Sequence, residues 1–222
     1  MHLNSELLFK KYYKQYFTNN LYVLEIGPAG IPSAYSKFVN NDTLTWHTLD
    51  FADTTYIASN TNKLTYIIQN PYQFPIPDEQ YDIVVSGQVI EHVQDIWLWL
   101  TEMKRILKKG GMIFIISPIS WPYHEAPLDC WRIYPSAYEA MAHKLNIELV
   151  FSKFETLEID LLKKLDSNVK TIPGKSFNYE VSMKRIRAIS IWNRVIRLIP
   201  IIKNLLIIPF EVSYDTITVF KK

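Results

Sequence analysis

The chain has 222 residues, of which 48% are hydrophobic and 21% are charged, and this predicts one decorated domain with a substantial core. A formal net charge of +2 argues against a whole-domain nucleic-acid binder, because such a protein would carry a strongly basic surface. Cys130 is the single cysteine and has no partner for an intramolecular disulfide, and without a charged-then-apolar leader a cytoplasmic location is expected.

Strand-like and helix-like segments alternate from the N-terminus. Residues 5–18 place leucine and tyrosine side chains on one helical face, with Ser5 as the N-cap. The apolar run at 22–26 predicts a short strand that is buried on both faces. We then expect a short helix, a second strand, a weak helix and a third strand, at residues 32–39, 43–51, 54–61 and 64–69.

The alternation continues through the rest of the chain. After a strand at 81–86, residues 94–109 form the clearest amphipathic helix, which is expected to end at Lys108-Lys109-Gly110-Gly111. A buried strand, a helix that begins with proline and two more strands follow, at residues 112–116, 135–145, 147–157 and 214–220. Such alternation predicts an α/β fold with a parallel sheet wrapped by helices.

Four groups of residues follow predicted strand ends, where parallel sheets bind ligands. They are Glu25 with Gly27, then Asp50, then Gln69 with Asn70, and finally residues 87–92. Glycine lets a ligand approach the main chain, and an acid about 20 or more residues later can hold ribose hydroxyls. Each of these residues alone also has a purely structural interpretation. The glycines would form a tight turn, Asp50 would cap a helix, and Asn70 would form a turn before proline. Together these residues predict a cofactor pocket.

Several motifs occur in a familiar order: VLEIGPAG at 23–30, LD at 49–50, FPIPDEQYDIVVSGQVIEHVQD at 74–95 and LKKGGMIFIISP at 107–118. Over roughly residues 20–157 the chain resembles class I S-adenosylmethionine-dependent methyltransferases, most of all the type 11 group. The resemblance implies a Rossmann-like sandwich with a mostly parallel seven-stranded sheet and helices on both faces. It implies a single domain with an N-terminal helix, a cofactor-binding core, a variable helical insertion and a final strand, at 1–20, 21–157, 158–212 and 213–222.

The same resemblance implies S-adenosylmethionine as the cofactor. The turn at 25–30 would face its methionine part, Asp50 the ribose hydroxyls and Asn70 the adenine edge. Gly87 and Gln88 would line the pocket below the sulfonium. The full set of implied cofactor contacts is Glu25, Gly27, Pro28, Ala29, Gly30, Asp50, Phe51, Gln69, Asn70, Gly87 and Gln88.

The chain departs from the family pattern at two places. Ala29 and Ile31 stand where the turn usually repeats glycine, and Asn70 stands where an acid is common. An amide both donates and accepts hydrogen bonds, so adenine binding should survive the second change. No metal is expected.

The segment SPISWPYHEAPLDCWRIYPSAY at 117–138 is too rich in large and ionisable groups for a plain connector. It is similar to a segment of methyltransferases encoded with polysaccharide or surface-glycan genes, in which DYWRFTP is typical. Here Cys130 replaces the second aromatic of that pattern. The similarity points to this segment as the acceptor side of the site.

Methyl transfer to a hydroxyl needs a proton acceptor, and His124 is the expected general base. Asp129 would orient it or act directly, and His92 is a third catalytic candidate. Arg132 would grip an anionic acceptor, with Tyr123 and Trp131 beside it in the substrate site. Structural alternatives stay open, because an Asp129–Arg132 salt bridge would fix the loop and His92 would orient it.

Residues 183–208 carry basic residues and no acid among many apolar ones, with prolines and charges too frequent for a membrane span. This segment would lie on an anionic membrane surface, or pack on the core or a second subunit. Expected partners are therefore a small-molecule or glycan acceptor, the inner face of the membrane and a second copy in a homodimer, with no nucleic acid.

The expected function is methyl transfer to oxygen on a sugar, nucleotide-sugar or glycan precursor of surface polysaccharide biosynthesis. One alternative is a methyltransferase for a natural product or a lipid-linked molecule, and another is an inert S-adenosylmethionine-binding scaffold subunit. A nicotinamide oxidoreductase is disfavoured, because no GxGxxG follows the first strand.

Overall fold

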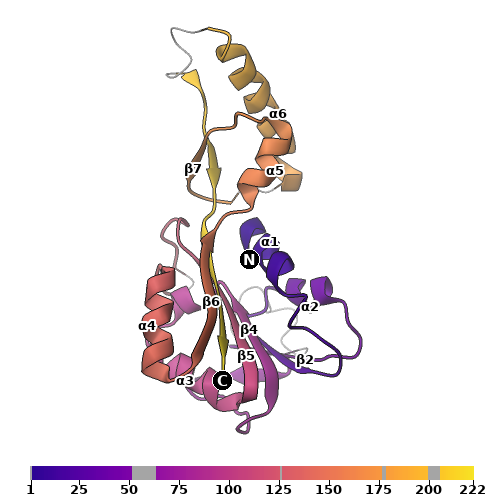
Figure 1. Cartoon of the computed structure of the whole chain (residues 1–222), viewed down its shortest axis with the longest axis vertical. Coiled ribbons are helices and arrows are strands. Elements are labelled where there is room, and N and C mark those ends of the chain that lie inside the picture. Colours follow the sequence, from indigo (N-terminus) through magenta and orange to yellow (C-terminus); the bar gives the residue numbers. More distant parts are fainter. Residues whose placement is uncertain (1, 52–63, 126, 177–178, 200–205) are drawn as a thin grey trace.

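The computed structural model describes residues 2–51, 64–125, 127–176, 179–199 and 206–222, with backbone alone for 179–183. Its centre is a seven-stranded sheet of order β3-β2-β1-β4-β5-β9-β6 (Figure 1). β9 is antiparallel to β5 and β6, and the other neighbours are parallel. The prediction of a mostly parallel seven-stranded sheet is confirmed. The strands are β1 (Tyr22–Ile26), β2 (Thr45–Phe51), β3 (Tyr66–Ile68), β4 (Tyr81–Gly87), β5 (Leu107–Pro118), β6 (Glu148–Glu155) and β9 (Asp215–Lys221).

Helices cover both faces of the sheet. Successive strand residues point to opposite faces, so Leu24 and Val84 pack with α3 (Ile96–Ile106) and α4 (Pro135–Leu145). Val23 and Val85 pack on the other face, with α1 (Leu3–Tyr12) and α2 (Ala34–Val39). This sandwich leaves the carboxyl ends of β1, β2, β4 and β5 together at one edge, which we call the carboxyl edge.

The first helix differs from its prediction at both ends. The N-cap is His2, while Ser5 lies inside the helix, is buried, and accepts a hydrogen bond from Nε2 of Gln88 at 2.8 Å. α1 ends at Tyr12 instead of continuing to residue 18, and Phe17 then packs into the core beyond a turn. Contacts with distant strands therefore outweigh the local helical pattern.

The boundary between α3 and β5 is a second correction. Asp95 caps α3 by accepting from the N–H groups of Trp97 and Leu98, at 3.1 and 3.0 Å. The helix ends at Ile106, and the basic and glycine residues expected to stop it begin β5 instead. At Gly111 a Cβ would lie 2.9 Å from the carbonyl oxygen of Asp82. Glycine here serves the close approach of two strands.

The remaining boundaries shift by a few residues or not at all. α4 spans the predicted residues 135–145, and α2 begins after Ser33, whose side chain accepts from the N–H of Ser36. The strand expected at 64–69 is shorter, at Tyr66–Ile68, and the one expected at 147–157 spans Glu148–Glu155. The weak helix expected near 54–61 lies outside the described residues.

Residues 158–212, here called the extension, stand beyond the carboxyl edge between β6 and β9 (Figure 1). Their elements are α5 (Glu158–Leu165), β7 (Thr171–Pro173), α6 (Tyr179–Ile196) and β8 (Phe210–Val212), with β7 and β8 paired in parallel. Leu162, Ile186, Phe210 and Val212 form a small separate core. Among the described helices, none is long and apolar enough to cross a bilayer.

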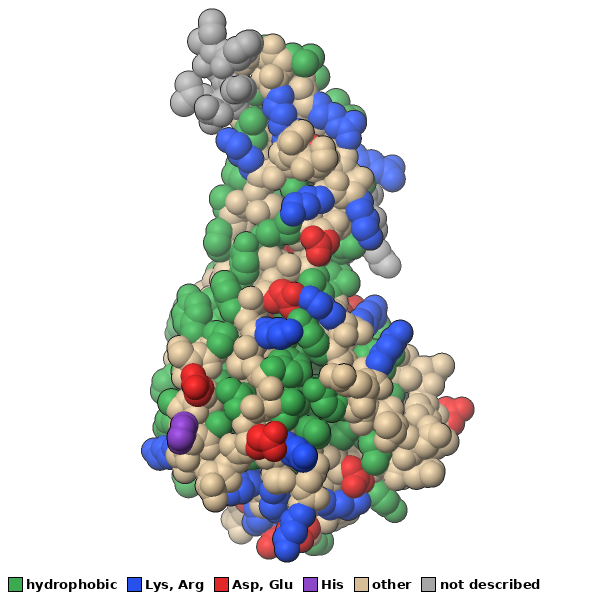
Figure 2. All heavy atoms as spheres, in the orientation of Figure 1, with side chains coloured by type: hydrophobic (Ala, Val, Ile, Leu, Met, Phe, Trp, Pro, Cys, Tyr) green, Lys and Arg blue, Asp and Glu red, His purple; other side chains and the backbone are tan. Residues whose placement is uncertain are grey.

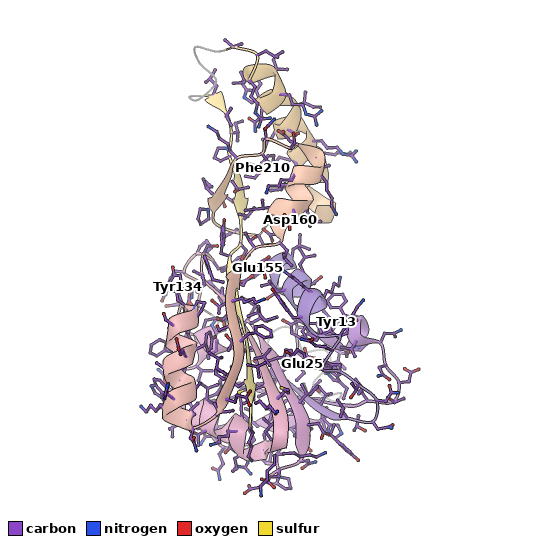
Figure 3. The ribbon with its side chains drawn as sticks, in the orientation of Figure 1. Tyr13, Glu25, Tyr134, Glu155, Asp160 and Phe210 are labelled. Carbon is purple, nitrogen blue, oxygen red and sulfur yellow. The ribbon has the colours of Figure 1, made fainter. Side chains whose placement is uncertain are left out.

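The junction between sheet and extension is held by α1. The buried amide of Asn4 donates to the carbonyl of Glu155 at 3.1 Å and to Oδ2 of Asp215 at 2.7 Å. Its oxygen accepts from the N–H of Leu157 at 2.8 Å. The hydroxyl of Tyr12 donates to the carboxylate of Glu155, which lies where β6 leaves the sheet (Figure 3). One helix thus contacts both chain crossings into the extension.

Candidate cofactor and acceptor site

The glycine turn after β1 has the backbone that its sequence predicts. Gly27 has a φ of +70°, its N–H donates to the carbonyl of Leu49 at 3.0 Å, and a Cβ there would lie 2.3 Å from Cγ2 of Val89. Gly30 has a φ of +143°, and a Cβ there would meet no described atom within 4 Å. The first glycine therefore serves packing between two strand ends, whereas the second leaves main chain uncovered, as a ligand cradle requires.

The turn is flanked by a buried acid, a buried proline and an exposed alanine. Glu25 is buried in β1, and its carboxylate accepts from Oγ of Ser33 and from Nε1 of Trp46 at 2.9 Å. Burial raises the pKa of Glu25 to about 7. Pro28 is buried and Ala29 is exposed. The acid thus ties β1 to β2 and to the start of α2, immediately below the turn.

Asp50 and Phe51 end β2 at the carboxyl edge. Oδ1 of Asp50 accepts from the N–H of Phe51 at 2.7 Å, and burial raises the pKa of Asp50 to about 6. Gln69 and Asn70 are exposed after β3, which pairs with β2 in parallel and ends beside Phe51. Oδ1 of Asn70 accepts from the N–H of Tyr72 at 2.9 Å, so this side chain also stabilises the turn before β4.

The end of β4 is occupied by protein groups. A Cβ on Gly87 would lie 2.0 Å from the hydroxyl oxygen of Tyr35, so glycine makes room for that ring. Gln88 turns toward α1 and β9: its Oε1 accepts from Nε2 of His2 at 3.0 Å, and its Nε2 is 3.4 Å from Oδ1 of Asp215. The amide of Gln88 therefore links α1 to the sheet, and its place in the pocket below the sulfonium stays a prediction.

His2 and Asp215 are residues that the sequence analysis missed. Burial raises the pKa of Asp215 to about 8 and lowers the pKa of His2 to about 3. The ring of His2 also stacks on Trp121, with centroids 4.6 Å apart. The three residues are far apart in sequence and share no motif, so local patterns hold no signal for this contact.

The two buried acids predict how stability depends on pH. Folded Glu25 and Asp215 have pKa values near 7 and 8, above their ordinary 4.5 and 3.8, so the folded chain binds more protons than the unfolded chain. Their contribution is complete below about pH 4 and is lost as pH rises toward 8. Thermal melting between about pH 7 and 8.5 should show falling stability, because an ordinary histidine is neutral there in both states. Asp215→Asn should flatten the slope, and an unchanged slope would contradict the assignment.

The loop between β5 and α4, residues 119–134, is fixed by an ion pair. The guanidinium of Arg132 donates to both carboxylate oxygens of Asp129, with 2.7 Å at Oδ2, and to the carbonyl of Trp121 at 3.1 Å. This pair lowers the pKa of Asp129 to about 2. Asp129 also accepts from the N–H of His124 at 2.8 Å. The salt bridge of the structural alternative is present, while the expected roles of Asp129 as an orienting group or base and of Arg132 as an anion grip stay predictions.

Two histidines and a buried acid meet where this loop contacts the short helix after β4. The rings of His92 and His124 are 5.0 Å apart and nearly perpendicular. His92 contacts the carbonyl of Leu128 through Nδ1, and burial lowers its pKa. Glu91 is fully buried in the short helix η2 (Ile90–His92), and burial raises its pKa to about 8. Within the part of the chain that the structure describes, neither of its carboxyl oxygens has a hydrogen-bond partner. Sequence reasoning passed over Glu91, although it precedes His92 directly in the IEHV run.

The expected acceptor residues lie on the outside of the same loop. Tyr123 is 72% exposed and donates to the carboxylate of Glu125 at 2.7 Å. Trp131 is partly exposed and donates through Nε1 to the carbonyl of Val93 at 2.7 Å, which ties the loop to the end of η2. Both rings therefore present apolar surface at the carboxyl edge.

Comparison with known proteins agrees with this geometry. Residues 8–115 match the family described as a methyltransferase domain. An uncharacterized methyltransferase of Schizosaccharomyces pombe is 35% identical over 78 residues, which are 35% of this chain and 25% of that protein. A ubiquinone/menaquinone biosynthesis C-methyltransferase of a Shewanella species is 30% identical over 73 residues, 33% of this chain and 29% of that protein. The chain thus spans under a third of either relative.

Solved structures resemble the chain over nearly its whole length. A SAM-dependent methyltransferase of Archaeoglobus fulgidus has a TM-score of 0.57 at 19% identity, covering 98% of this chain and 94% of that one. The [4+2]-cyclase SpnF has a TM-score of 0.57 at 11% identity, and the match covers 98% of this chain and 80% of that one. Because a cyclase shares the fold, the likeness shows the fold alone. Residues 8–115 therefore resemble the methyltransferase-domain family, within a chain that has the fold seen in S-adenosylmethionine-dependent methyltransferases of known structure.

Proposed function

We propose that the chain transfers a methyl group from S-adenosylmethionine to an oxygen of a sugar, nucleotide-sugar or glycan precursor. The observation that carries the proposal is the meeting of three features at the carboxyl edge. These are the glycine turn after β1, the carboxylate of Asp50 after β2, and the histidine pair where the loop 119–134 contacts η2.

The residues at the turn fit this cofactor. Gly30 leaves main chain uncovered, and Asp50 uses one oxygen for the N–H of Phe51, so a carboxylate of this kind has acceptor capacity left for a ribose diol. When bound, S-adenosylmethionine supplies an electrophilic methyl group on a sulfonium. The protein's remaining tasks are to orient the acceptor, exclude water and remove a proton.

Asp50→Ala should weaken the binding of S-adenosylhomocysteine by about 1–3 kcal/mol, because it removes hydrogen bonds to a charged acceptor. Isothermal titration measures the dissociation constant, and the melting temperature reports on the fold. Asp42→Ala is the matched control, since Asp42 is exposed in the turn before β2. Equal affinity in both variants would remove Asp50 from the site.

The acceptor side favours a sugar. Pyranose rings have apolar C–H faces that stack on aromatic rings, and Tyr123 and Trp131 expose such rings on a loop fixed by the Asp129–Arg132 pair. His92 and His124 lie at the same place, and imidazole is the side chain best suited to proton transfer near neutral pH. We therefore place the loss of the acceptor's proton at this histidine pair.

Labelled methyl transfer tests the function. The protein is incubated with methyl-labelled S-adenosylmethionine and separate fractions of nucleotide sugars, glycan lipids and small metabolites, and label is followed by chromatography. Alkali-stable label on the sugar moiety supports the proposal. Label on carbon or nitrogen overturns the oxygen assignment. Binding of S-adenosylhomocysteine without transfer to any fraction favours the scaffold alternative, and binding of NAD in its place would identify a different enzyme class.

An exposed face of α6 favours one form of this substrate, a lipid-linked precursor. Ile191, Trp192 and Val195 project from one side of α6, followed by Leu198, which is 80% exposed. Lys and Arg side chains spread over the extension, with few acids among them (Figure 2). An apolar stripe beside basic residues suits an anionic bilayer surface. Leu198→Glu should reduce co-sedimentation with phosphatidylglycerol vesicles, and Leu98→Glu, an exposed leucine on α3, should not.

A further inference from the structure

The histidine pair belongs to a cluster with metal-ligating chemistry. Glu91 and His92 come from η2 and His124 comes from the loop 119–134, and one ligand atom of each lies within 4.8 Å of the others. Oε1 of Glu91 is 3.8 Å from Nε2 of His92. Bonds of about 2.1 Å to one ion place neighbouring ligand atoms about 3 to 4 Å apart. The half-exposed loop that carries His124 therefore needs to move inward by about 1 to 2 Å.

Both rings are oriented as metal ligands are. Nδ1 of His92 contacts the carbonyl of Leu128, and Nδ1 of His124 is 3.1 Å from the carbonyl of Pro122 and 3.3 Å from Oδ2 of Asp129. Carbonyl and carboxylate oxygens only accept, so each Nδ1 carries the hydrogen and each Nε2 keeps a free lone pair. Ligating histidines usually donate their other N–H to such a group. The outer shell of a metal site is thus already present.

The buried carboxyl group of Glu91 is a second observation that points to a cation, and it does not depend on the orientation of the two rings. The side chain of Glu91 is fully buried, neither carboxyl oxygen has a hydrogen-bond partner among the described residues, and Oε1 lies 3.8 Å from Nε2 of His92. A buried carboxyl group without partners costs free energy, and a bound cation would supply the missing interaction. Arg132 attracts this carboxyl group electrostatically, but the hydrogen bonds of its guanidinium go to Asp129 and to backbone carbonyls.

We propose that Glu91, His92 and His124 bind one divalent transition-metal ion through a carboxylate oxygen and two Nε2 atoms. Two histidines and one carboxylate favour Zn²⁺, Fe²⁺ or Co²⁺ over Mg²⁺ and Ca²⁺, which prefer oxygen ligands. Positions left open on the ion would take the acceptor hydroxyl, which then gives up its proton to solvent more readily. This last role rests on the proposed function, whereas the metal site does not.

Cobalt uptake by the full chain tests the site. The protein carries Cys130→Ser and no histidine tag, because an exposed thiol or a tag would bind cobalt elsewhere. It is freed of metal with a chelator, dialysed and titrated with Co²⁺, with uptake followed by visible absorption and elemental analysis. One Co²⁺ per chain with d–d bands is expected. His92→Gln, His124→Gln and the isosteric Glu91→Gln should each weaken uptake by at least about 100-fold, and Asp129→Asn by about 10-fold or more.

His143→Gln is the matched control, since His143 is exposed on α4 away from the cluster, and it should leave uptake unchanged. Absence of stoichiometric uptake by the parent chain overturns the site, as does full uptake by a folded His92→Gln/His124→Gln double variant. Methyl transfer is assayed in parallel. Cobalt uptake without transfer supports the site while the proposed function fails, and transfer unaffected by the chelator overturns the catalytic role of the ion.

Discussion

Replacing Gly27 with valine should abolish the binding of S-adenosylhomocysteine. The residue has a φ of +70°, which a β-branched side chain adopts only under strain. A Cβ would also lie 2.3 Å from Cγ2 of Val89, so the turn and the end of β4 must separate. One substitution thus displaces the turn that we assign to the cofactor from the end of β4. Isothermal titration measures the loss, and circular dichroism shows whether the sheet survives.

A double variant separates the two causes. Gly27→Ala alone should bind weakly, and Gly27→Ala/Val89→Ala should recover part of the affinity, because the second change removes the atom in conflict. The cost that remains is backbone strain of about 1–2 kcal/mol. A Cβ at Gly30 meets no described atom, so the change in melting temperature of Gly30→Ala gives a reference for strain without collision. Wild-type affinity in Gly27→Val would show that the turn lies outside the site.

His124→Gln should lower the turnover number by roughly 100-fold or more while the affinity for S-adenosylhomocysteine stays within a factor of about two. Glutamine keeps the size and polarity of the side chain but cannot exchange a proton near neutral pH. The expectation is the same whether the imidazole takes the proton itself or holds the proposed cation, since both act at the acceptor hydroxyl.

The turnover of His124→Gln is measured with the acceptor fraction that takes up label, and His143→Gln on the surface of α4 is assayed beside it. Equal turnover in the two variants would make His124 a loop residue. The proton-transfer role would then pass to His92, whose ring is 5.0 Å away.

The sequence predicts the sheet well because buried strands of a parallel sheet are short apolar runs that end in turn residues. Gly27, Asp50 and Asn70 were found at strand ends for that reason, and β1, β2 and β3 bring them to one edge. The end of α3 was predicted wrongly, because the basic and glycine residues at 108–111 look like a helix stop. Pairing of β5 with β4 decides that boundary, and pairing is a property of distant residues.

The sequence predicted the positions of site residues at strand ends better than the hydrogen-bond partners of their side chains. Arg132 was open to two interpretations, and the structure adds its contacts with Asp129 and the carbonyl of Trp121, while anion binding stays a prediction. Glu91 occupies an ordinary place in a motif. The sequence alone does not indicate that its carboxyl group is buried without a hydrogen-bond partner among the described residues. Burial and hydrogen bonding depend on the packing of several elements at once, so a local pattern does not contain them.

The hydrogen bonds of Asn4 limit how α1 can move. Its amide uses both donor and acceptor on the two chain segments that lead into and out of the extension, and the same helix places His2 and Ser5 on Gln88 at the end of β4. A displacement of α1 from the carboxyl edge therefore breaks hydrogen bonds at the ends of β6 and β9 and at Gln88 together. An opening above β4 would thus couple the N-terminal helix to the base of the extension.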